Sequence, residues 1–126
     1  MGQIKQIKCT RCEYQKEILI GGGLSDCKLK TILAALPGKQ QRELAAEINR
    51  GAAFVSITRQ PRVCSACGTI QALPVVTYML DGTQKTLYGA CSQCGKDADA
   101  SWNDAQTGTC PTCGAAVEIR NAGHWD

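Results

Sequence analysis

Residues 91–114 read CSQCGKDADASWNDAQTGTCPTCG, and this stretch decides the fold of the chain. It holds two Cys-x-x-Cys segments, Cys91-Ser-Gln-Cys94 and Cys110-Pro-Thr-Cys113, with fifteen residues between them. Further toward the N-terminus, Cys9-Thr-Arg-Cys12 and Cys64-Ser-Ala-Cys67 repeat the same spacing. Two residues between cysteines let one tight turn direct both sulfurs at a single point, and the glycine that follows three of the four segments suits a turn with positive φ. The repeats therefore indicate four metal-binding turns, which we call knuckles.

The knuckles favour zinc as the metal. Two knuckles together supply four thiolates, which complete a tetrahedral shell with Zn–S distances of about 2.3 Å. With only six aromatic residues among 126, the chain has little material for a large apolar core, so metal binding is expected to organise the fold. We expect two zinc ions per chain. The expected ligands are the eight paired cysteines: Cys9, Cys12, Cys64, Cys67, Cys91, Cys94, Cys110 and Cys113.

Four knuckles can pair into two sites in three ways. The fifteen residues between the last two knuckles fall within the C-x2-C-x15–20-C-x2-C spacing of zinc sites. This spacing favours one site from Cys91, Cys94, Cys110 and Cys113, and it leaves Cys9, Cys12, Cys64 and Cys67 for the other. The main alternative is a crossed arrangement in which Cys64 and Cys67 join Cys91 and Cys94.

The hydrophobic pattern between the first two knuckles predicts two helices. Leu29, Ile32, Leu33 and Leu36 follow helical spacing, with Ser25 or Asp26 as the expected N-cap and Pro37-Gly38 as the end. A second helix from about Lys39 to Arg50 is expected to bury Leu44, Ala45 and Ile48, with Gly51 just after its end. We interpret residues 26–51 as an αα-hairpin inserted in the loop of a zinc site.

The remaining segments favour strands. Residues 3–8, 14–20, 54–58, 69–80, 83–88 and 115–119 have extended character, and Asp81-Gly82 predicts a tight hairpin turn. Pro74 suggests an edge position or a bulge, because proline has no N–H for a central strand. The fold class expected is a small, metal-stabilised α+β protein with antiparallel strands. Its expected domains are an N-terminal zinc ribbon over residues 1–80, which includes the helical hairpin, and a C-terminal zinc ribbon over residues 81–126.

The chain resembles the zinc-ribbon, or rubredoxin-like, knuckle proteins. Cys110-Pro-Thr-Cys113-Gly114 and Cys91-Ser-Gln-Cys94-Gly95 carry the likeness, and residues 25–51 stand outside it. The layout, including the Trp125-Asp126 ending, is similar to small bacterial zinc-ribbon proteins of unassigned function. The resemblance implies a fold and a metal but no activity. Rubredoxins hold iron in similar knuckles, and this chain lacks the aromatic cluster that they pack around it.

Other candidate residues have ordinary explanations. Cys27, the unpaired cysteine, stands beside Lys28 with no histidine nearby in sequence, and His124 stands outside any ligand spacing. Gly21-Gly22-Gly23 precedes a helix but matches no nucleotide-binding motif. A zinc ion closed by four thiolates has no place for a catalytic water. We therefore expect a protein that is not an enzyme.

Charge and cysteine usage indicate the setting and the partner. Residues 1–62 carry eleven Lys or Arg against five Asp or Glu, whereas residues 63–126 carry three against six. The first residues lack the apolar stretch of a signal peptide, and no transmembrane span is evident, so we expect a reducing cytoplasm and no membrane contact. The leading hypothesis is a zinc-binding adaptor that contacts a protein, or a nucleic acid through its basic N-terminal half. The alternative is a rubredoxin-like electron carrier or a metallochaperone.

Overall fold

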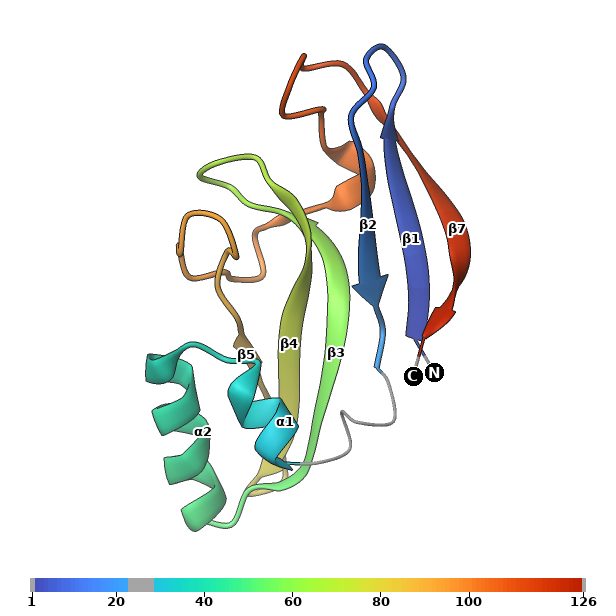
Figure 1. Ribbon diagram of the computed structural model, residues 1–126. Helices are drawn as coiled ribbons and strands as arrows, with labels where there is room; N and C mark the ends of the chain where they lie inside the picture. Colours follow the sequence, from blue (N-terminus) through green and yellow to red (C-terminus); the bar gives the residue numbers. More distant parts are fainter. Residues whose placement is uncertain (1, 23–28, 126) are drawn as a thin grey trace.

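The computed structural model describes residues 2–22 and 29–125 and consists mostly of antiparallel strands with two α-helices (Figure 1). The strands form a three-stranded sheet of order β2-β1-β7 and a four-stranded sheet of order β5-β4-β3-β6. The elements of the first sheet are β1 (Gly2–Cys9), β2 (Gln15–Ile20) and β7 (Val117–Trp125). Those of the second are β3 (Ala53–Val63), β4 (Ile70–Leu80), β5 (Thr83–Tyr88) and β6 (Asn103–Asp104), and β6 runs into the short 3-10 helix η2 (Ala105–Thr107).

The three-stranded sheet joins the two ends of the chain. β1 pairs with β2 on one side and with β7 on the other, in a register that sets Cys9 opposite Val117. The last strand is longer than the predicted 115–119 segment, because it continues to Trp125. There the indole Nε1 donates to the carbonyl oxygen of Ile20 at 2.9 Å, and a Cβ added at Gly2 would lie only 2.2 Å from that nitrogen. Glycine is therefore required at position 2.

The four-stranded sheet is built on β4, which lies between β3 and β5. The edge position that Pro74 suggested is wrong. The Pro74 carbonyl accepts from the N–H of Gly89 at 2.9 Å, just beyond the last β5 residue, Tyr88, which pairs with Val75. The proline nitrogen faces the same side, past the end of β5, so no ladder hydrogen bond is lost.

The hairpin turn between β4 and β5 is the one predicted. Asp81 and Gly82 have φ values of 52° and 76°, and two successive positive φ values belong to the tight turns that match the twist of a hairpin. The boundary expected between the two zinc-ribbon domains, after residue 80, falls in this turn. The strands on either side of it, β4 and β5, are hydrogen-bonded to each other.

Two helices lie between β2 and β3: α1 (Leu29–Ala34) and α2 (Gly38–Asn49). Ile32, Leu36 and Leu44 are buried against β3, β4 and β5, as the helical spacing predicted. Leu29 is 44% exposed and Ala45 is also exposed, so their predicted burial is wrong. Gly51, with φ of 105°, follows α2 in the predicted left-handed position. The expected caps Ser25 and Asp26 lie outside the described residues.

The interior consists of three small clusters, each with its own position in the fold. One packs the helices against β3, β4 and β5 around Val76 and Tyr78, and it contains no cysteine. The second surrounds Trp102 and includes Cys64 and Cys91. The third packs Ile7 and Ile18 of the first sheet against Ile70 and Ala105. Cysteine is thus part of the core near one pair of knuckles.

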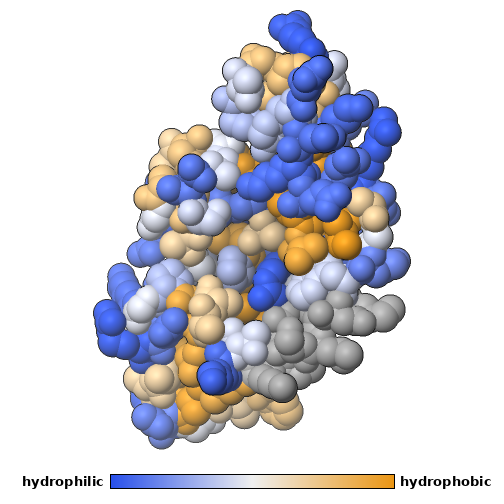
Figure 2. Space-filling view, in the orientation of Figure 1, coloured by the Kyte–Doolittle hydropathy of each residue, from blue (hydrophilic) through white to orange (hydrophobic). Residues whose placement is uncertain are grey.

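The side of the molecule shown in Figure 2 carries both hydrophilic and hydrophobic residues. The large hydrophobic side chains that are exposed among the described residues are Leu19 (44%), Leu29 (44%) and Phe54 (84%). Phe54 is also held at φ of 54°, a left-handed conformation that is uncommon for a bulky residue. None of the described helices is long and apolar enough to cross a membrane.

Candidate metal centres

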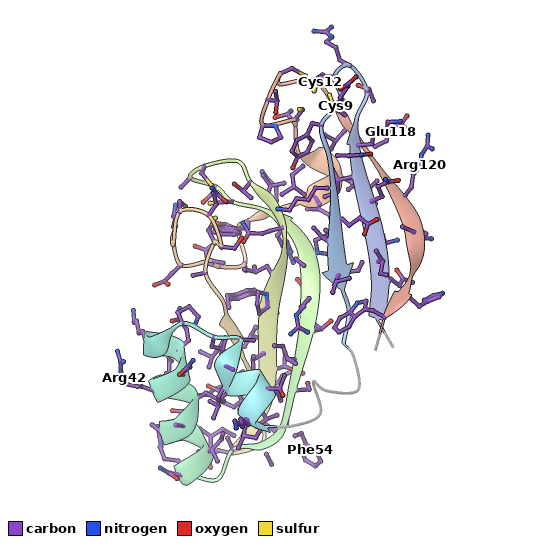
Figure 3. The ribbon with its side chains drawn as sticks, viewed as in Figure 1. Cys9, Cys12, Arg42, Phe54, Glu118 and Arg120 are labelled. Carbon is purple, nitrogen blue, oxygen red and sulfur yellow. The ribbon has the colours of Figure 1, made fainter. Side chains whose placement is uncertain are left out.

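The first group of sulfurs joins the two ends of the chain, and we call it the terminal site. It contains Cys9, Cys12, Cys110 and Cys113. Cys9 Sγ lies 3.4 Å from Cys113 Sγ, and Cys12 Sγ lies 3.5 Å from Cys110 Sγ. Figure 3 shows Cys9 and Cys12 at one end of the three-stranded sheet, where Cys9 ends β1 and Cys12 lies in the loop to β2. The β1–β7 pairing carries the last knuckle to this place, because Cys110 and Cys113 directly precede β7.

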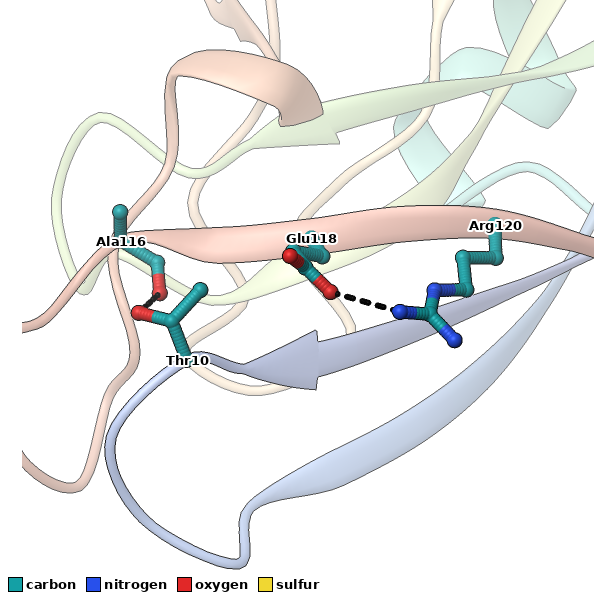
Figure 4. A network of polar contacts seen from close by, with 4 residues as sticks. All are labelled: Thr10, Ala116, Glu118 and Arg120. Atoms are coloured by element: carbon teal, nitrogen blue, oxygen red, sulfur yellow. Dashed lines mark hydrogen bonds and ion pairs between the residues drawn. The ribbon is translucent and has the colours of Figure 1, made fainter.

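The same end of the sheet is held by contacts outside the sulfurs. The Thr10 N–H and the Thr10 hydroxyl both donate to the Ala116 carbonyl, at 3.2 and 2.9 Å (Figure 4). Further along β7, Arg120 Nη2 donates to Glu118 Oε2 at 3.1 Å on the exposed surface. The two Thr10 contacts align the first knuckle with the start of β7, whereas the Arg120–Glu118 pair joins two residues of the same strand. The terminal site therefore depends on strand register as well as on sulfur.

The second group, which we call the central site, contains Cys64, Cys67, Cys91 and Cys94. Cys64 Sγ lies 3.6 Å from Cys94 Sγ, and Cys67 Sγ lies 3.6 Å from Cys91 Sγ. One knuckle is the connection between β3 and β4, and the other follows β5. Since β4 pairs with both β3 and β5, the two connections meet at the same end of the four-stranded sheet.

The pairing predicted from spacing is therefore wrong, and the crossed arrangement is the one present. The fifteen-residue interval between Cys94 and Cys110 matches the length of a local loop, but β6 and η2 in that interval carry the chain from one sheet to the other. Long-range strand pairing, rather than the length of the nearest loop, decides which knuckles meet. All eight predicted ligands do lie in the two groups.

The geometry of both groups fits a metal ion. In each group the four sulfurs lie within 4.8 Å of one another. A tetrahedral ion with sulfur at about 2.3 Å would separate its ligands by about 3.8 Å, close to the 3.4–3.6 Å of the shortest contacts. Four soft thiolates suit zinc or iron rather than magnesium or calcium. Each group could therefore hold one metal ion.

Backbone N–H groups surround the first sulfur of each knuckle. At Cys9 the donors are the N–H groups of Arg11 and Cys12, both at 3.3 Å. The pattern recurs at the other knuckles, with donors to Cys64, Cys91 and Cys110 at 3.3–3.5 Å. Gly68, Gly95 and Gly114 have φ values of 77°, 78° and 77°, as their place after the second cysteine predicted. Backbone N–H groups directed at a sulfur stabilise its thiolate form.

The ionisation of the sulfurs follows from this setting. The N–H groups of Cys12 and Arg11 lower the pKa of Cys9 to about 6. The Tyr14 N–H acts to lower the pKa of Cys12, but burial and the neighbouring sulfurs raise it to about 12. In the central site, burial opposes ionisation of Cys91, but the Cys94 N–H and the Gln71 amide bring its pKa down to about 6. Four sulfurs this close cannot all be ionised unless a cation compensates their negative charge, because like charges disfavour one another's ionisation. A bound metal ion supplies that cation.

Burial divides each site into an inner and an outer side. The first cysteine of every knuckle is buried, whereas Cys67, Cys94 and Cys113 are exposed and Cys12 is half-buried. Each metal would therefore lie at the surface with one sulfur pair anchored in the core and the other facing solvent.

Two side chains that the sequence analysis did not single out contact the central site. Gln71 Nε2 donates to Cys91 Sγ at 3.2 Å, and Thr69 Oγ1 lies 3.1 Å from Cys67 Sγ. Both follow the Cys64–Cys67 knuckle: Thr69 directly precedes β4, and Gln71 is the second residue of that strand. The sequence signal that could have found them is a polar residue two or four positions after the second cysteine of a knuckle.

The other candidate residues named from the sequence are not among the ligands of the two sulfur groups. His124 lies on β7 opposite Gln3, outside both sulfur groups. Cys27, Lys28 and Gly23 lie outside the described residues, and Gly21 forms a bridge to Arg59.

Cations of the basic half also contact protein groups. Lys16 Nζ donates to the Ile70 carbonyl at 2.9 Å, and Arg62 Nη1 donates to the Trp102 carbonyl at 2.8 Å. The Arg59 guanidinium lies 5.4 Å from the centroid of the Trp125 ring. Arg42, on α2, and Arg120, on β7, lie at opposite ends of the molecule in Figure 3. Lys16, Arg59 and Arg62 of the N-terminal half are therefore engaged within the protein.

Comparison with known proteins adds no assignment: the chain matches no family model, no curated protein and no solved structure.

Proposed function

We propose that this chain is a non-enzymatic binding or adaptor protein that holds two structural zinc ions, one in the terminal and one in the central site. The observation that carries the proposal is the assembly of eight cysteines into two groups of four, with their sulfurs within 4.8 Å of one another. We regard the knuckle loops as two zinc-ribbon-like units and α1 and α2 as a helical hairpin inserted between strands.

A structural rather than catalytic role follows from the ligand set. Four thiolates fill the tetrahedral shell of zinc and leave no position for a substrate or a reactive water. When bound, the ion would supply a fixed cross-link between chain segments and neutralise part of the thiolate charge. The residues that hold it do the rest: their N–H groups orient the sulfurs, and their buried members anchor the loops. A reducing compartment such as the cytoplasm would keep these thiols available.

The surface near the helices supports a protein partner. Phe54 exposes 84% of its surface and is held in an unfavourable backbone conformation. Strain of this kind gathers at functional positions, and aromatic side chains are enriched in protein interfaces. Figure 3 places Phe54 at the end of the molecule that carries the helices, away from the terminal site. Nucleic acid is the weaker candidate, because Lys16, Arg59 and Arg62 of the basic half already contact protein groups.

Metal analysis tests the first part of this proposal. Protein purified without added metal is expected to contain two zinc ions per chain, by elemental analysis and by native mass spectrometry. A coloured protein with iron in both sites would support a rubredoxin-like electron carrier instead. Metal-free protein with all eight thiols oxidised would contradict metal binding altogether.

Partner binding needs separate experiments. Proteins captured by the zinc-loaded chain should be lost when Phe54 is replaced by glycine. They should be retained with a control change such as Gln15→Ala, at an exposed position of β2 in the other sheet. Labelled DNA and RNA, titrated at low and moderate salt, test the other candidate. Binding that falls steeply with salt and weakens when Lys30, Lys39 and Arg42 are replaced together would favour nucleic acid.

The exposed outer sulfurs favour one second function, metal transfer. Cys67, Cys94 and Cys113 face solvent, where an incoming ligand can attack the bound ion. A metallochaperone should pass zinc to an apo-acceptor faster than free diffusion of released zinc allows. A transfer rate equal to the spontaneous release rate would exclude this function.

A further inference from the structure

We propose that Gln71 and Thr69 are positioning residues that make the central site the tighter of the two metal sites. The inference rests on the proposed metal binding. Both side chains direct polar hydrogens at sulfurs of that site, one inside the core and one at the surface.

Gln71 connects the core of the four-stranded sheet to the knuckle at Cys91. Its side chain lies on β4 and is only 4% exposed. Nε2 donates to Cys91 Sγ at 3.2 Å, while Oε1 accepts from the N–H of Ser92 at 2.9 Å. Both ends of the amide are thus satisfied by one knuckle. A buried amide is costly to leave unpaired, so Gln71 holds that loop in the shape that binds metal.

Thr69, which directly precedes β4, contacts the other knuckle of the site, Cys64–Cys67. Its Oγ1 lies 3.1 Å from Cys67 Sγ. A thiolate has no proton to give, so in the metal-bound state the hydroxyl is the donor. The outer sulfur is therefore stabilised as a thiolate although it faces solvent.

The terminal site offers a comparison within the same chain. Counted from the first cysteine of the knuckle, Thr69 and Gln71 correspond to Ala115 and Val117 in the segment that begins at Cys110. Neither has a side-chain donor. In the segment that begins at Cys9 the corresponding residues are Tyr14 and Lys16, and Lys16 Nζ donates to the Ile70 carbonyl instead of a sulfur. In the part of the chain that the structure describes, the side-chain hydrogen bonds from residues other than cysteine to the eight sulfurs are those of Gln71 and Thr69, whereas backbone donors occur at both sites.

This difference predicts a higher metal affinity for the central site than for the terminal site. Hydrogen bonds to an ionised group are stronger than those between neutral groups, and they spread the negative charge of a four-thiolate shell. Replacing a residue that hydrogen-bonds to a metal ligand typically lowers the metal affinity by about 10- to 100-fold. The central site exposes two sulfurs and the terminal site one, which favours faster access of a chelator to the central site. Access determines how fast a chelator removes the metal. The added donors lower the free energy of the metal-bound state, so they determine which site binds more tightly at equilibrium.

The test uses the full chain loaded with ¹¹³Cd, which reports each site separately. Two resonances are expected, each assigned through its couplings to the cysteine β-protons. Titration with a chelator should empty the terminal site first. In Gln71→Met the affinity of the central site should fall about 10- to 100-fold, its resonance should shift, and the terminal resonance should stay in place.

Thr69→Val keeps the shape of the side chain at a partly exposed position, so it provides the same test if Gln71→Met folds poorly. Gln84→Met and Thr83→Val make the same chemical changes at exposed positions of β5 and should leave both sites unchanged. An unchanged central affinity in Thr69→Val and Gln71→Met, an equal loss at both sites, or earlier emptying of the central site in the unaltered chain would overturn the inference. Failure of the unaltered chain to bind two cadmium ions would instead contradict the proposed function.

Discussion

The arrangement of the knuckles makes a direct prediction for the variant Cys110→Ser. Cys110 is buried, and its sulfur lies 3.5 Å from that of Cys12. Loss of one thiolate should empty the terminal site and leave the central site loaded. The metal content should therefore fall from two ions to one.

The size of the effect follows from the contribution of the metal to folding. Structural zinc supplies on the order of 10–16 kcal/mol of apparent binding free energy, as much as the net stability of about 5–15 kcal/mol of a typical domain. The terminal site closes the ends of β1, β2 and β7, and the buried cluster that supports this sheet is the small one around Ile7 and Ile18. The three-stranded sheet should lose order, while the helices and β3–β5 keep a core without cysteine.

Alkylation followed by mass spectrometry measures which thiols are released. In a background with Cys27 replaced by serine, Cys110→Ser should make Cys9, Cys12 and Cys113 reactive and leave the four central thiols protected. The matched variant Cys91→Ser should release Cys64, Cys67 and Cys94 instead. The reasoning is refuted if Cys110→Ser releases Cys91 and Cys94 while Cys9 and Cys12 stay protected, because that pattern belongs to the pairing expected from spacing.

Three further predictions concern the rest of the fold. Trp125→Phe removes the hydrogen bond to the Ile20 carbonyl and should lower the free energy of unfolding by about 1 kcal/mol in urea titrations; no change would mean that the indole N–H contributes nothing there. Phe54→Gly should raise the free energy of unfolding by about 1 kcal/mol, because a left-handed conformation costs a non-glycine residue about 1–2 kcal/mol and the ring is 84% exposed. Phe54→Ala is its control, since alanine loses the ring but keeps the strain, and equal stabilities of the two variants would contradict the explanation. Complete chelation should abolish the dispersed amide signals of the knuckle loops and leave helical circular dichroism from α1 and α2, whose core contains no cysteine; loss of all helical signal would show that the helices depend on metal.

Local chemistry explains which features the sequence predicted correctly. The knuckles, the turn at Asp81-Gly82 and the two helices each depend on residues a few positions apart, whose conformational preferences act without the rest of the chain. The errors at Leu29 and Ala45 arose at the margins of an apolar stripe, where burial depends on what the helix packs against. Pro74 was misjudged because proline only lacks an N–H to donate, so a central strand tolerates it where no partner carbonyl needs that donor, and β5 ends there.

The sequence by itself determined that eight cysteines form four turns able to bind metal, because a Cys-x-x-Cys turn places both sulfurs together whatever surrounds it. Only the tertiary structure decided which turns share an ion. β1 and β7, from opposite ends of the chain, pair in a register that sets Cys9 opposite Val117, and β4 lies between β3 and β5 so that their connections meet. The same packing directs Gln71 and Thr69 at the central site. A four-sulfur shell takes its ligands from wherever the strands deliver them, and strand pairing over long sequence separations depends on the whole folded chain.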